Sequence, residues 1–322
     1  MIKKLYDTSH GEYFLGDVNE ALQSVKLSKY HKKINLILTS PPFPLLKKKE
    51  YGNLEGQEYI DWMTETVVNC IDFLTDDGSI VVEIGNAWES GQPTISTVPM
   101  EALLNIKKTT GLHLCQEIIV HNPARLPSPV EWVNIERSRL KDSWTRVWWF
   151  SKTPNPKATN IKVLKEYSAS MKSVLKKKQY NSGERPSGHK IGATSFLKDH
   201  GGAISPSFID FTQKYLFNSL NSSISLSNSG QQKQYQKHCD DNAIKRHPAR
   251  MQSTLVDFFI HFLTEENDIV MDIFAGSNTT GWRSQELNRQ WVGLERDWNY
   301  GIGSVGRFSE LVAKFDLKNY VV

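Results

Sequence analysis

The chain has 322 residues, 39% of them hydrophobic, which allows one large domain or two and is ordinary for a soluble protein. It contains no run of about eighteen apolar residues and begins with a polar segment, so we expect neither a transmembrane helix nor a signal peptide. Its three cysteines lie far apart, which argues against a zinc ribbon or a disulfide framework and fits a reducing cytoplasm.

The net charge of +4 is unevenly distributed along the chain. Residues 151–250 carry 17 Lys and Arg against 6 Asp and Glu, whereas the rest of the chain carries 22 against 29. A basic middle segment in an acidic chain is typical of a polyanion-binding region, although a lysine-rich surface exposed to solvent gives the same count.

The first half of the chain alternates apolar runs with segments of helical period. Strands are predicted at residues 12–18, 34–38, 79–85, 114–121 and 144–150, helices after residue 18 and at 57–74 and 98–111, and a turn at Asp77-Gly78. Strand–helix–strand units of these lengths predict an α/β fold with a parallel sheet and crossover helices.

Residues 151–250 lack sustained periodicity, and the Ser/Asn/Gln-rich tract Asn218–Gln236 is typical of a mobile loop. We therefore expect an inserted region of loops and short elements rather than a second large core. Regular structure then returns with a predicted helix at 254–263, a strand at 269–274, a loop at 275–281 that opens a helix to residue 288, and a strand at 291–295. There is no internal repeat.

The most informative segment is Thr39-Ser40-Pro41-Pro42-Phe43, which follows the buried strand at 34–38. Prolines fix φ and donate no backbone hydrogen bond, so their carbonyls are held stiffly and can accept one. With the Ser40 hydroxyl and the Phe43 ring, they suit a flat group that carries an amino donor, such as the edge of a base. The alternative is an ordinary junction between a strand and a turn.

A second segment, around Gly276, has the order strand, glycine-containing loop, helix and strand with an acid at its end. Gly276 allows close approach of a ligand, and Glu295 lies where a carboxylate can hold ribose hydroxyls. The spacing is not GxGxxG and no P-loop lysine follows, while Asp272 argues against a pyrophosphate. A cationic nucleoside without phosphate, such as S-adenosylmethionine, fits better than NAD or ATP. A tight βα turn in some other α/β enzyme remains the alternative.

Taken together, Ser40-Pro41-Pro42-Phe43 and the segment from Asp272 to Gly281 resemble the amino-group DNA methyltransferases. The Ser-Pro-Pro-Phe form is typical of the cytosine-N4 enzymes, and the order of the two motifs resembles their β group. Further segments are most similar to the PvuII type: Tyr51–Glu55, Leu126–Pro129, Glu131–Asn134, Val147–Lys152, Arg185–His189 and His247–Arg250. Two positions depart from the wider family. Asn278 stands where many members have glycine. His121 stands before Asn122-Pro123, where an aromatic residue is often found, so the residue that forms the second face of the base pocket is left open.

The resemblance implies a Rossmann-like, S-adenosylmethionine-dependent methyltransferase sheet with permuted motif order. Residues 1–150 would form the catalytic part, 151–246 the target-recognition region and 247–322 the cofactor-binding part. The implied activity is site-specific methylation of cytosine N4 in duplex DNA, after the base is flipped out of the helix. The implied role is that of the modification enzyme in a restriction system.

Site residues follow from the same resemblance. In catalysis, Ser40 and the Pro41 carbonyl would accept from the amino group, Pro42 would complete the edge, Phe43 would stack on the base, and Glu83 could take the released proton. Glu83 could instead only hold a loop or the amino acid end of the cofactor. The residues expected around the cofactor are Asp17, Asp272, Phe274, Gly276, Ser277, Asn278, Thr279, Glu295 and His247. Asp17 would accept from the adenine amino group, although aspartate at this place also commonly caps a helix.

For DNA, Lys47, Lys48 and Lys49 are expected to bind phosphates, and Arg185, Ser187 and His189 to make base-edge or backbone contacts. No histidine has a partner at metal-ligand spacing, so no metal is predicted. We expect a monomer without an obligate protein partner, located in the cytoplasm with the nucleoid.

Three other functions remain open on sequence alone. The same fold carries out N6-adenine methylation, since both bases present a planar amino group. An RNA or protein-amide methyltransferase can share an x-Pro-Pro-x edge, although the basic insertion favours a large nucleic acid. A binding module that only retains the fold is disfavoured by the intact Ser40, Gly276 and Glu295.

Overall fold

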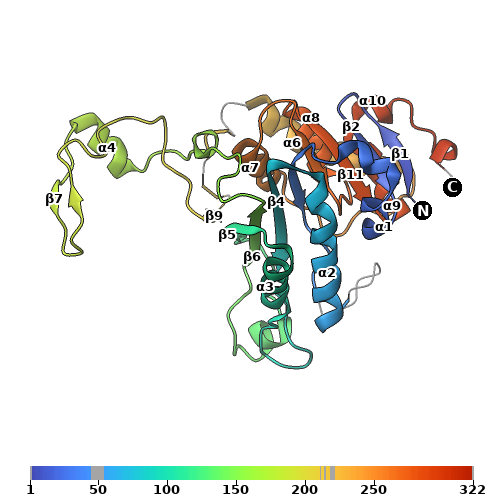
Figure 1. The fold of residues 1–322 in the computed structure, drawn as a ribbon, viewed down its shortest axis with the longest axis horizontal. Coiled ribbons are helices and arrows are strands. Elements are labelled where there is room, and N and C mark those ends of the chain that lie inside the picture. The colour runs from blue at the N-terminus through green and yellow to red at the C-terminus, as the bar shows by residue number, and fades with distance from the viewer. Residues whose placement is uncertain (1, 45–53, 211, 214, 218–221, 321–322) are drawn as a thin grey trace.

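The computed structural model describes residues 2–44, 54–210, 212–213, 215–217 and 222–320, with residues 222–231 and 319 described by their backbone alone. Within this part, nine strands form one sheet (Figure 1). In chain order they are β1 (Lys3–Asp7), β2 (Gly11–Leu15), β3 (Ile34–Thr39), β4 (Leu74–Gly85), β5 (His113–His121), β6 (Trp144–Ser151), β9 (Phe208–Asp210), β10 (Ile269–Asp272) and β11 (Gln290–Glu295).

Helices precede and follow these strands. They are α1 (Val18–Leu22), α2 (Gly56–Cys70), α3 (Val98–Thr110), α4 (Ala169–Lys177), α6 (Ser222–Asp241), α7 (Ser253–Leu263), α8 (Thr279–Glu286), α9 (Trp298–Ser304) and α10 (Ser309–Val312). A short antiparallel pair, β7 (Gly183–Glu184) and β8 (Lys190–Ile191), stands apart from the main sheet.

The strand order across the sheet is β1-β2-β11-β10-β3-β4-β6-β5-β9. All strands run in one direction except β1 and β6, which are antiparallel to their neighbours. The parallel sheet expected from the sequence is therefore confirmed, with a reversed strand inserted between β4 and β5. Since β10 and β11 lie between β2 and β3, the beginning and the end of the chain build one sheet.

The core lies on both faces of this sheet because successive side chains of a strand point to opposite sides. Ile80 and Val82 of β4 pack in the cluster that includes buried residues of α2 and α3. Val81 packs in the other cluster, with buried residues of α7. This alternation places α1, α2 and α3 on one face and α7 on the opposite face.

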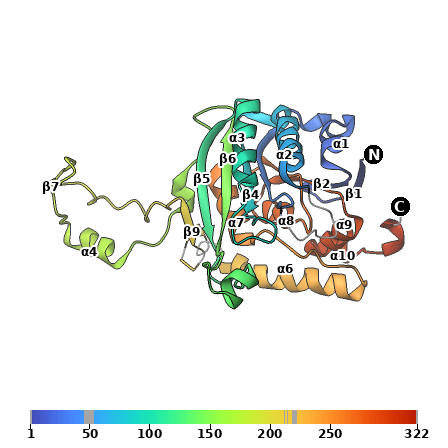
Figure 2. The same cartoon turned by 90° about the horizontal axis from the view of Figure 1, so that it is seen from below.

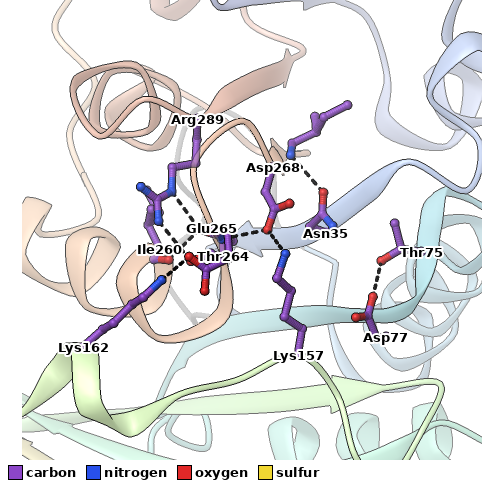
Figure 3. Close-up of polar contacts among 11 residues, drawn as sticks. Asn35, Thr75, Asp77, Lys157, Lys162, Ile260, Thr264, Glu265, Asp268 and Arg289 are labelled. Atoms are coloured by element: carbon purple, nitrogen blue, oxygen red, sulfur yellow. Dashed lines mark hydrogen bonds and ion pairs between the residues drawn. The ribbon is translucent and has the colours of Figure 1, made fainter.

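The carboxyl ends of β2, β3, β4, β5, β10 and β11 meet at one edge of the sheet, and the antiparallel β6 begins there. At the opposite edge, ion pairs tie the start of the basic insertion to the segment before β10 (Figure 3). Lys157 Nζ lies 2.6 Å from Asp268 Oδ2, and Lys162 pairs with Glu265. The first of these edges opens into a large cavity.

Two predicted elements differ from the structure. Asp77-Gly78 is not a turn: β4 runs through it, and its pairing with β3 shifts register between Ile34 and Leu36, so that the extra residues are accommodated as an irregularity in the ladder. The tract Asn218–Gln236 is not a loop where the structure describes it, because α6 begins at Ser222. The sequence of α6 has little apolar period, but Tyr235 and Cys239 near its end are buried against α9.

Residues 165–200 extend away from the body of the molecule in both views and carry α4, β7 and β8 (Figures 1 and 2). We call this segment the arm. None of its residues is buried, and it holds eight Lys and Arg against three Asp and Glu. At its base, Lys165 and Ala203 exchange backbone hydrogen bonds of 2.8 and 2.9 Å. In this segment the structure shows short elements without a core of their own.

Candidate active site

A cavity of about 1260 Å³ opens at the carboxyl edge of the sheet. It brings together all the catalytic and cofactor residues expected from the sequence except Asn278. Those that line it are Asp17, Ser40, Pro41, Pro42, Phe43, Glu83, His247, Asp272, Phe274, Gly276, Ser277, Thr279 and Glu295. Two motifs that lie more than 200 residues apart in the sequence therefore share one cavity.

The Ser-Pro-Pro-Phe segment leaves β3 at Thr39, whose buried hydroxyl donates to Asp272 Oδ1 at 2.8 Å. This bond joins the end of β3 to the end of β10 and fixes where Ser40 emerges. Phe43 packs against the end of β4: a Cβ added at Gly85 would lie 2.6 Å from the Phe43 ring. The absence of a side chain at Gly85 therefore leaves room for the ring against the end of β4.

Glu83 lies near the end of β4, beside Ser40. Thr145 Oγ1, from the start of β6, donates to Glu83 Oε1 at 3.1 Å. Burial raises the pKa of Glu83, and hydrogen bonds from Thr145 and Ser40 together with the charge of Arg125 oppose that rise. A carboxylate that is partly desolvated but approached by hydroxyl donors is suited to accept a proton.

Arg125 is held near Glu83 by the loop that joins β5 to β6. Its Nη1 donates to the Trp144 carbonyl at 3.0 Å and lies 3.3 Å from Asp142 Oδ2. Asn86 Nδ2 donates to the other oxygen of Asp142 at 2.9 Å. The carboxylate of Asp142 thus offsets the guanidinium charge and keeps Arg125 at a distance at which it influences Glu83 without pairing with it.

The turn from β10 into α8 forms the second half of the site. Gly276 has φ +49, and a Cβ there would lie 2.9 Å from the His247 ring, so only glycine fits without displacing the histidine. Asp272 is buried, accepts from Thr39 and from Thr280 Oγ1 at 2.7 Å, and burial raises its pKa. These hydrogen bonds of Asp272 hold the turn from β10 into α8 in place.

Glu295, at the end of β11, reaches across to this turn. The Gly276 N–H donates to Oε2 at 2.9 Å, and the N–H groups of Arg296 and Asp297 each donate to Oε1 at 2.8 Å. Burial raises the pKa of Glu295 to about 6, against the opposing effect of these bonds. An ionised carboxylate offers about four acceptor positions, so one remains, on Oε2, for a ligand in the cavity.

Asp17 and His247 occupy the rim of the cavity. Asp17 caps α1, since its Oδ1 accepts from the N–H groups of Asn19 at 3.0 Å and Glu20 at 3.3 Å. The structural role considered from the sequence is therefore present, and Oδ2 is left for a further contact. His247 packs edge-on against Tyr300, with ring centroids 4.4 Å apart, and over Gly276.

Asn278 does not line the cavity. It is fully buried with φ +55, caps α8 by accepting from the Gly281 N–H at 3.1 Å, and donates to the Tyr6 hydroxyl at 3.1 Å. The side chain of Asn278 therefore points into the core between α8 and β1 and not into the cavity.

Several cavity residues were not predicted. Tyr59 and Trp62 of α2 line the wall near Phe274, with the Trp62 and Phe274 rings 5.5 Å apart. Thr145 and Arg125 approach Glu83. The helical period of α2 could have indicated that Tyr59 is buried, but no local signal indicates that Thr145 reaches Glu83.

The residues expected to bind DNA fall into two groups. Lys47, Lys48 and Lys49 lie outside the described residues. Arg185, Ser187 and His189 lie in the exposed β7–β8 hairpin of the arm, which extends away from the body of the molecule (Figure 1). There the Arg185 N–H donates to the His189 carbonyl at 2.8 Å. The described part of the chain contains no group of three or more side chains that could hold a metal ion. No helix within it is long and apolar enough to cross a membrane.

The fold and the site define a class. The sheet is mostly parallel and has helices on both faces, with a glycine turn after one strand and an acid at the end of the next. This is the Rossmann-like fold of S-adenosylmethionine-dependent methyltransferases. Here the Ser-Pro-Pro-Phe motif precedes the glycine turn in the sequence. A DNA methylase family model matches residues 34–301, and the chain belongs to that family.

Individual relatives agree with this assignment. The chain is 41% identical to the Type II methyltransferase M.PvuII of Proteus hauseri, over 95% of this chain and 86% of that protein. It is 24% identical to the Type II methyltransferase M.BglII of Bacillus subtilis, over 83% of this chain and 61% of the relative. A solved structure described as PvuII DNA methyltransferase (cytosine-N4-specific) superposes with a TM-score of 0.71 at 33% identity, covering 99% of this chain and 92% of that one.

Proposed function

We propose that this chain is a site-specific DNA methyltransferase that transfers a methyl group from S-adenosylmethionine to the exocyclic N4 of a flipped cytosine in duplex DNA. The observation that carries the proposal is the pairing of Ser40 and Glu83 at the ends of neighbouring strands, in the cavity that also contains the Gly276 turn. The likeness to a chain described as cytosine-N4-specific supports the choice of base and atom.

Cytosine N4 is a poor nucleophile because its lone pair is delocalised into the ring. The Ser40 hydroxyl bonds toward Glu83, so its oxygen is available to accept from the amino group. With the Pro41 carbonyl as a second acceptor, the amino hydrogens are held and the lone pair turns toward the methyl donor. Positioning of this kind supplies up to roughly 7–11 kcal/mol at its ideal limit. Phe43, fixed against Gly85, stacks on the base.

The methylated amino group must lose a proton, and Glu83 is placed to receive it. Ser40 lies between Glu83 and the expected place of the base, so the proton passes through its hydroxyl or directly to the carboxylate. Thr145 keeps one carboxylate oxygen in place. No cysteine nucleophile is needed for this chemistry.

The cavity fits the proposed cofactor. Its volume of about 1260 Å³ exceeds the roughly 300–1,000 Å³ of small-molecule sites, leaving room for a base beside a nucleoside. Glu295 has one acceptor position for a ribose hydroxyl, Asp17 can accept from an adenine amino group, and Gly276 lets the His247 ring pack closely over the turn. When bound, S-adenosylmethionine supplies an electrophilic methyl group on a sulfonium.

Duplex DNA is the proposed partner, lying across the cavity with the arm along it. The arm residues, including Arg185, Ser187 and His189, would contact phosphates or base edges, and Lys47, Lys48 and Lys49 would bind phosphate beside the flipped base. We further propose that the protein acts as a monomer in the cytoplasm, without an obligate protein partner, as the modification enzyme of a restriction system.

Nucleoside mass spectrometry tests the proposal on DNA from cells that express the chain, with Ser40→Ala as the control. We expect N4-methylcytosine in the first sample and its loss in the second. N6-methyladenine would keep the fold and cofactor but refute the choice of base. The absence of both marks would transfer the proposal to RNA or protein substrates or to a binding module.

A further inference from the structure

Arg307, at the end of a 3₁₀ turn after α9 (Val305–Arg307), is a buried cation beside the cofactor part of the cavity. Its side chain is 2% exposed, and its hydrogen-bond acceptors among the described residues are neutral. Nε donates to the Ser277 carbonyl at 3.2 Å and Nη1 to Gln232 Oε1 at 3.0 Å. Burial lowers the pKa of its guanidinium to about 10, so it stays charged at neutral pH. A buried charge held only by neutral acceptors would gain from an anionic group in the adjoining cavity.

The contacts of Arg307 fix the polarity of two hydroxyls that line the cavity. Nη2 donates to Ser277 Oγ at 3.3 Å and to Thr279 Oγ1 at 3.4 Å, and these two oxygens lie 3.4 Å apart. Both hydroxyls therefore accept from the guanidinium. If the two hydroxyls bond to each other, only one of their two protons is taken up. At least one O–H therefore remains to donate into the cavity.

A second arginine reinforces the positive potential. The guanidinium of Arg307 lies 4.5 Å from the centroid of the Tyr235 ring, and that of Arg250, which lines the cavity, lies 5.4 Å from the same ring. Arg250 likewise has no carboxylate partner among the described residues. The Tyr235 hydroxyl accepts from the His247 N–H at 2.9 Å, which connects this cluster to the residue that covers Gly276.

We propose that Arg307 is a positioning residue for the carboxylate of the cofactor's methionine group: it turns the Ser277 and Thr279 hydroxyls into donors toward that carboxylate and, with Arg250, supplies the opposite charge. The proposal rests on the proposed function, since it assumes the cofactor. Arg307 would then let the protein discriminate S-adenosylmethionine from analogues that lack the carboxylate.

Calorimetric titration with S-adenosylmethionine and with decarboxylated S-adenosylmethionine tests this without measuring turnover. The wild type should prefer the carboxylate-bearing ligand by roughly ten- to a hundredfold, the range of a hydrogen bond to a charged group. In Arg307→Met this preference should fall toward one, mainly through weaker binding of S-adenosylmethionine. Arg307→Lys, which keeps the charge, should restore part of it.

Arg289→Met is the matched control. Arg289 is also buried and also donates to a threonine, with Nε 3.0 Å from Thr264 Oγ1, but it lies at the opposite edge of the sheet (Figure 3). This variant should keep the wild-type preference. If Arg307→Met does not fold, the double variant Ser277→Ala, Thr279→Val removes the same donors and should also reduce the preference.

An unchanged preference in folded Arg307→Met, or in the double variant, would overturn the proposal and leave Arg307 as a packing residue. A wild-type chain that bound neither ligand would instead overturn the proposed function, and this inference with it.

Discussion

Glu83 is the residue whose charge state governs the proton-accepting step of the proposed reaction. Burial raises its pKa, so acidification protonates it early, and a protonated Glu83 cannot accept the proton from the methylated base. Single-turnover methylation should therefore slow as the pH falls through this raised pKa. In Glu83→Gln we expect a loss of roughly 10²–10⁴-fold and a rate that no longer depends on pH in that range.

The contacts of Glu83 with Ser40 and Thr145 separate this role from cofactor binding. Calorimetry should show nearly unchanged affinity for S-adenosylmethionine in Glu83→Gln. Near-normal turnover with weaker cofactor binding would contradict the assignment and favour a role in holding the cofactor.

The same burial has a consequence for stability. The pKa of Glu83 is higher in the folded state than in the unfolded state. Glu83 therefore contributes to the free energy of unfolding when the pH is below its unfolded-state pKa. This contribution is lost as the pH rises through its folded-state pKa. The neutral Glu83→Gln side chain escapes that loss. It should therefore gain stability relative to wild type as the pH rises, which denaturation at several pH values would measure.

From the contacts of Glu295 we expect the affinity for S-adenosylmethionine, rather than turnover, to depend on pH. With three of its acceptor positions filled by backbone N–H groups, the position left on Oε2 is the one that a proton would occupy. Burial raises its pKa to about 6, so affinity for S-adenosylmethionine should be full above this value and fall below it. Calorimetry between pH 5 and 8 would measure this, and an affinity that is constant across pH 6 would refute the ribose contact.

At the scale of elements, the arm is expected to supply non-specific affinity for DNA. Lys176, Lys177 and Lys178, at the end of α4, have no ion-pair partner among the described residues. Replacing all three by Gln should weaken DNA binding equally for all sequences. The slope of log K against log salt should decrease by about 0.9 for each phosphate that the variant no longer neutralises.

Fluorescence anisotropy over a range of salt concentrations would measure this slope. The matched control is Lys107→Gln with Lys108→Gln, in the last turn of α3, which runs back from β4 to the edge opposite the cavity. If the control and the arm variant bound DNA equally weakly, the arm would have no special role in binding DNA.

Elements whose formation depends on nearby residues were predictable from the sequence. The apolar run of β3 and the rigid Pro41-Pro42 edge identify the catalytic strand, and the turn at Gly276 identifies the cofactor strand. Thr145 could not be predicted, because it approaches Glu83 only through the register of β6 on β4, in which Gly85 pairs with Thr145. Such register depends on packing across the whole sheet.

The sequence also did not indicate that α6 is a helix or that Asn278 faces the core. The reason is similar to that for Thr145. In both, contacts with distant segments decide the local structure: α9 for the end of α6, and Tyr6 of β1 for Asn278. A Ser/Asn/Gln tract has no apolar period to indicate a helix, and a residue in a glycine-rich turn can face the ligand or the core.

At the scale of the molecule, the arm is separable from the sheet. None of its residues is buried, and Lys165 and Ala203 already meet at its base. Replacing residues 167–200 with a short Gly-Ser turn should leave the melting temperature and S-adenosylmethionine affinity close to wild type, while DNA affinity falls. Calorimetry and anisotropy on the same preparation would measure both, and loss of cofactor binding would show that the arm supports the fold.

The position of β10 and β11 between β2 and β3 has a consequence for synthesis of the protein. As the chain leaves the ribosome, β2 and β3 each lack the neighbour on their inner side until residues 269–295 have emerged. The Ser-Pro-Pro-Phe edge is made early, but Asp272, which anchors Thr39, arrives among the last segments. A partly synthesised chain therefore cannot complete its site, and only nearly finished molecules can begin to modify DNA.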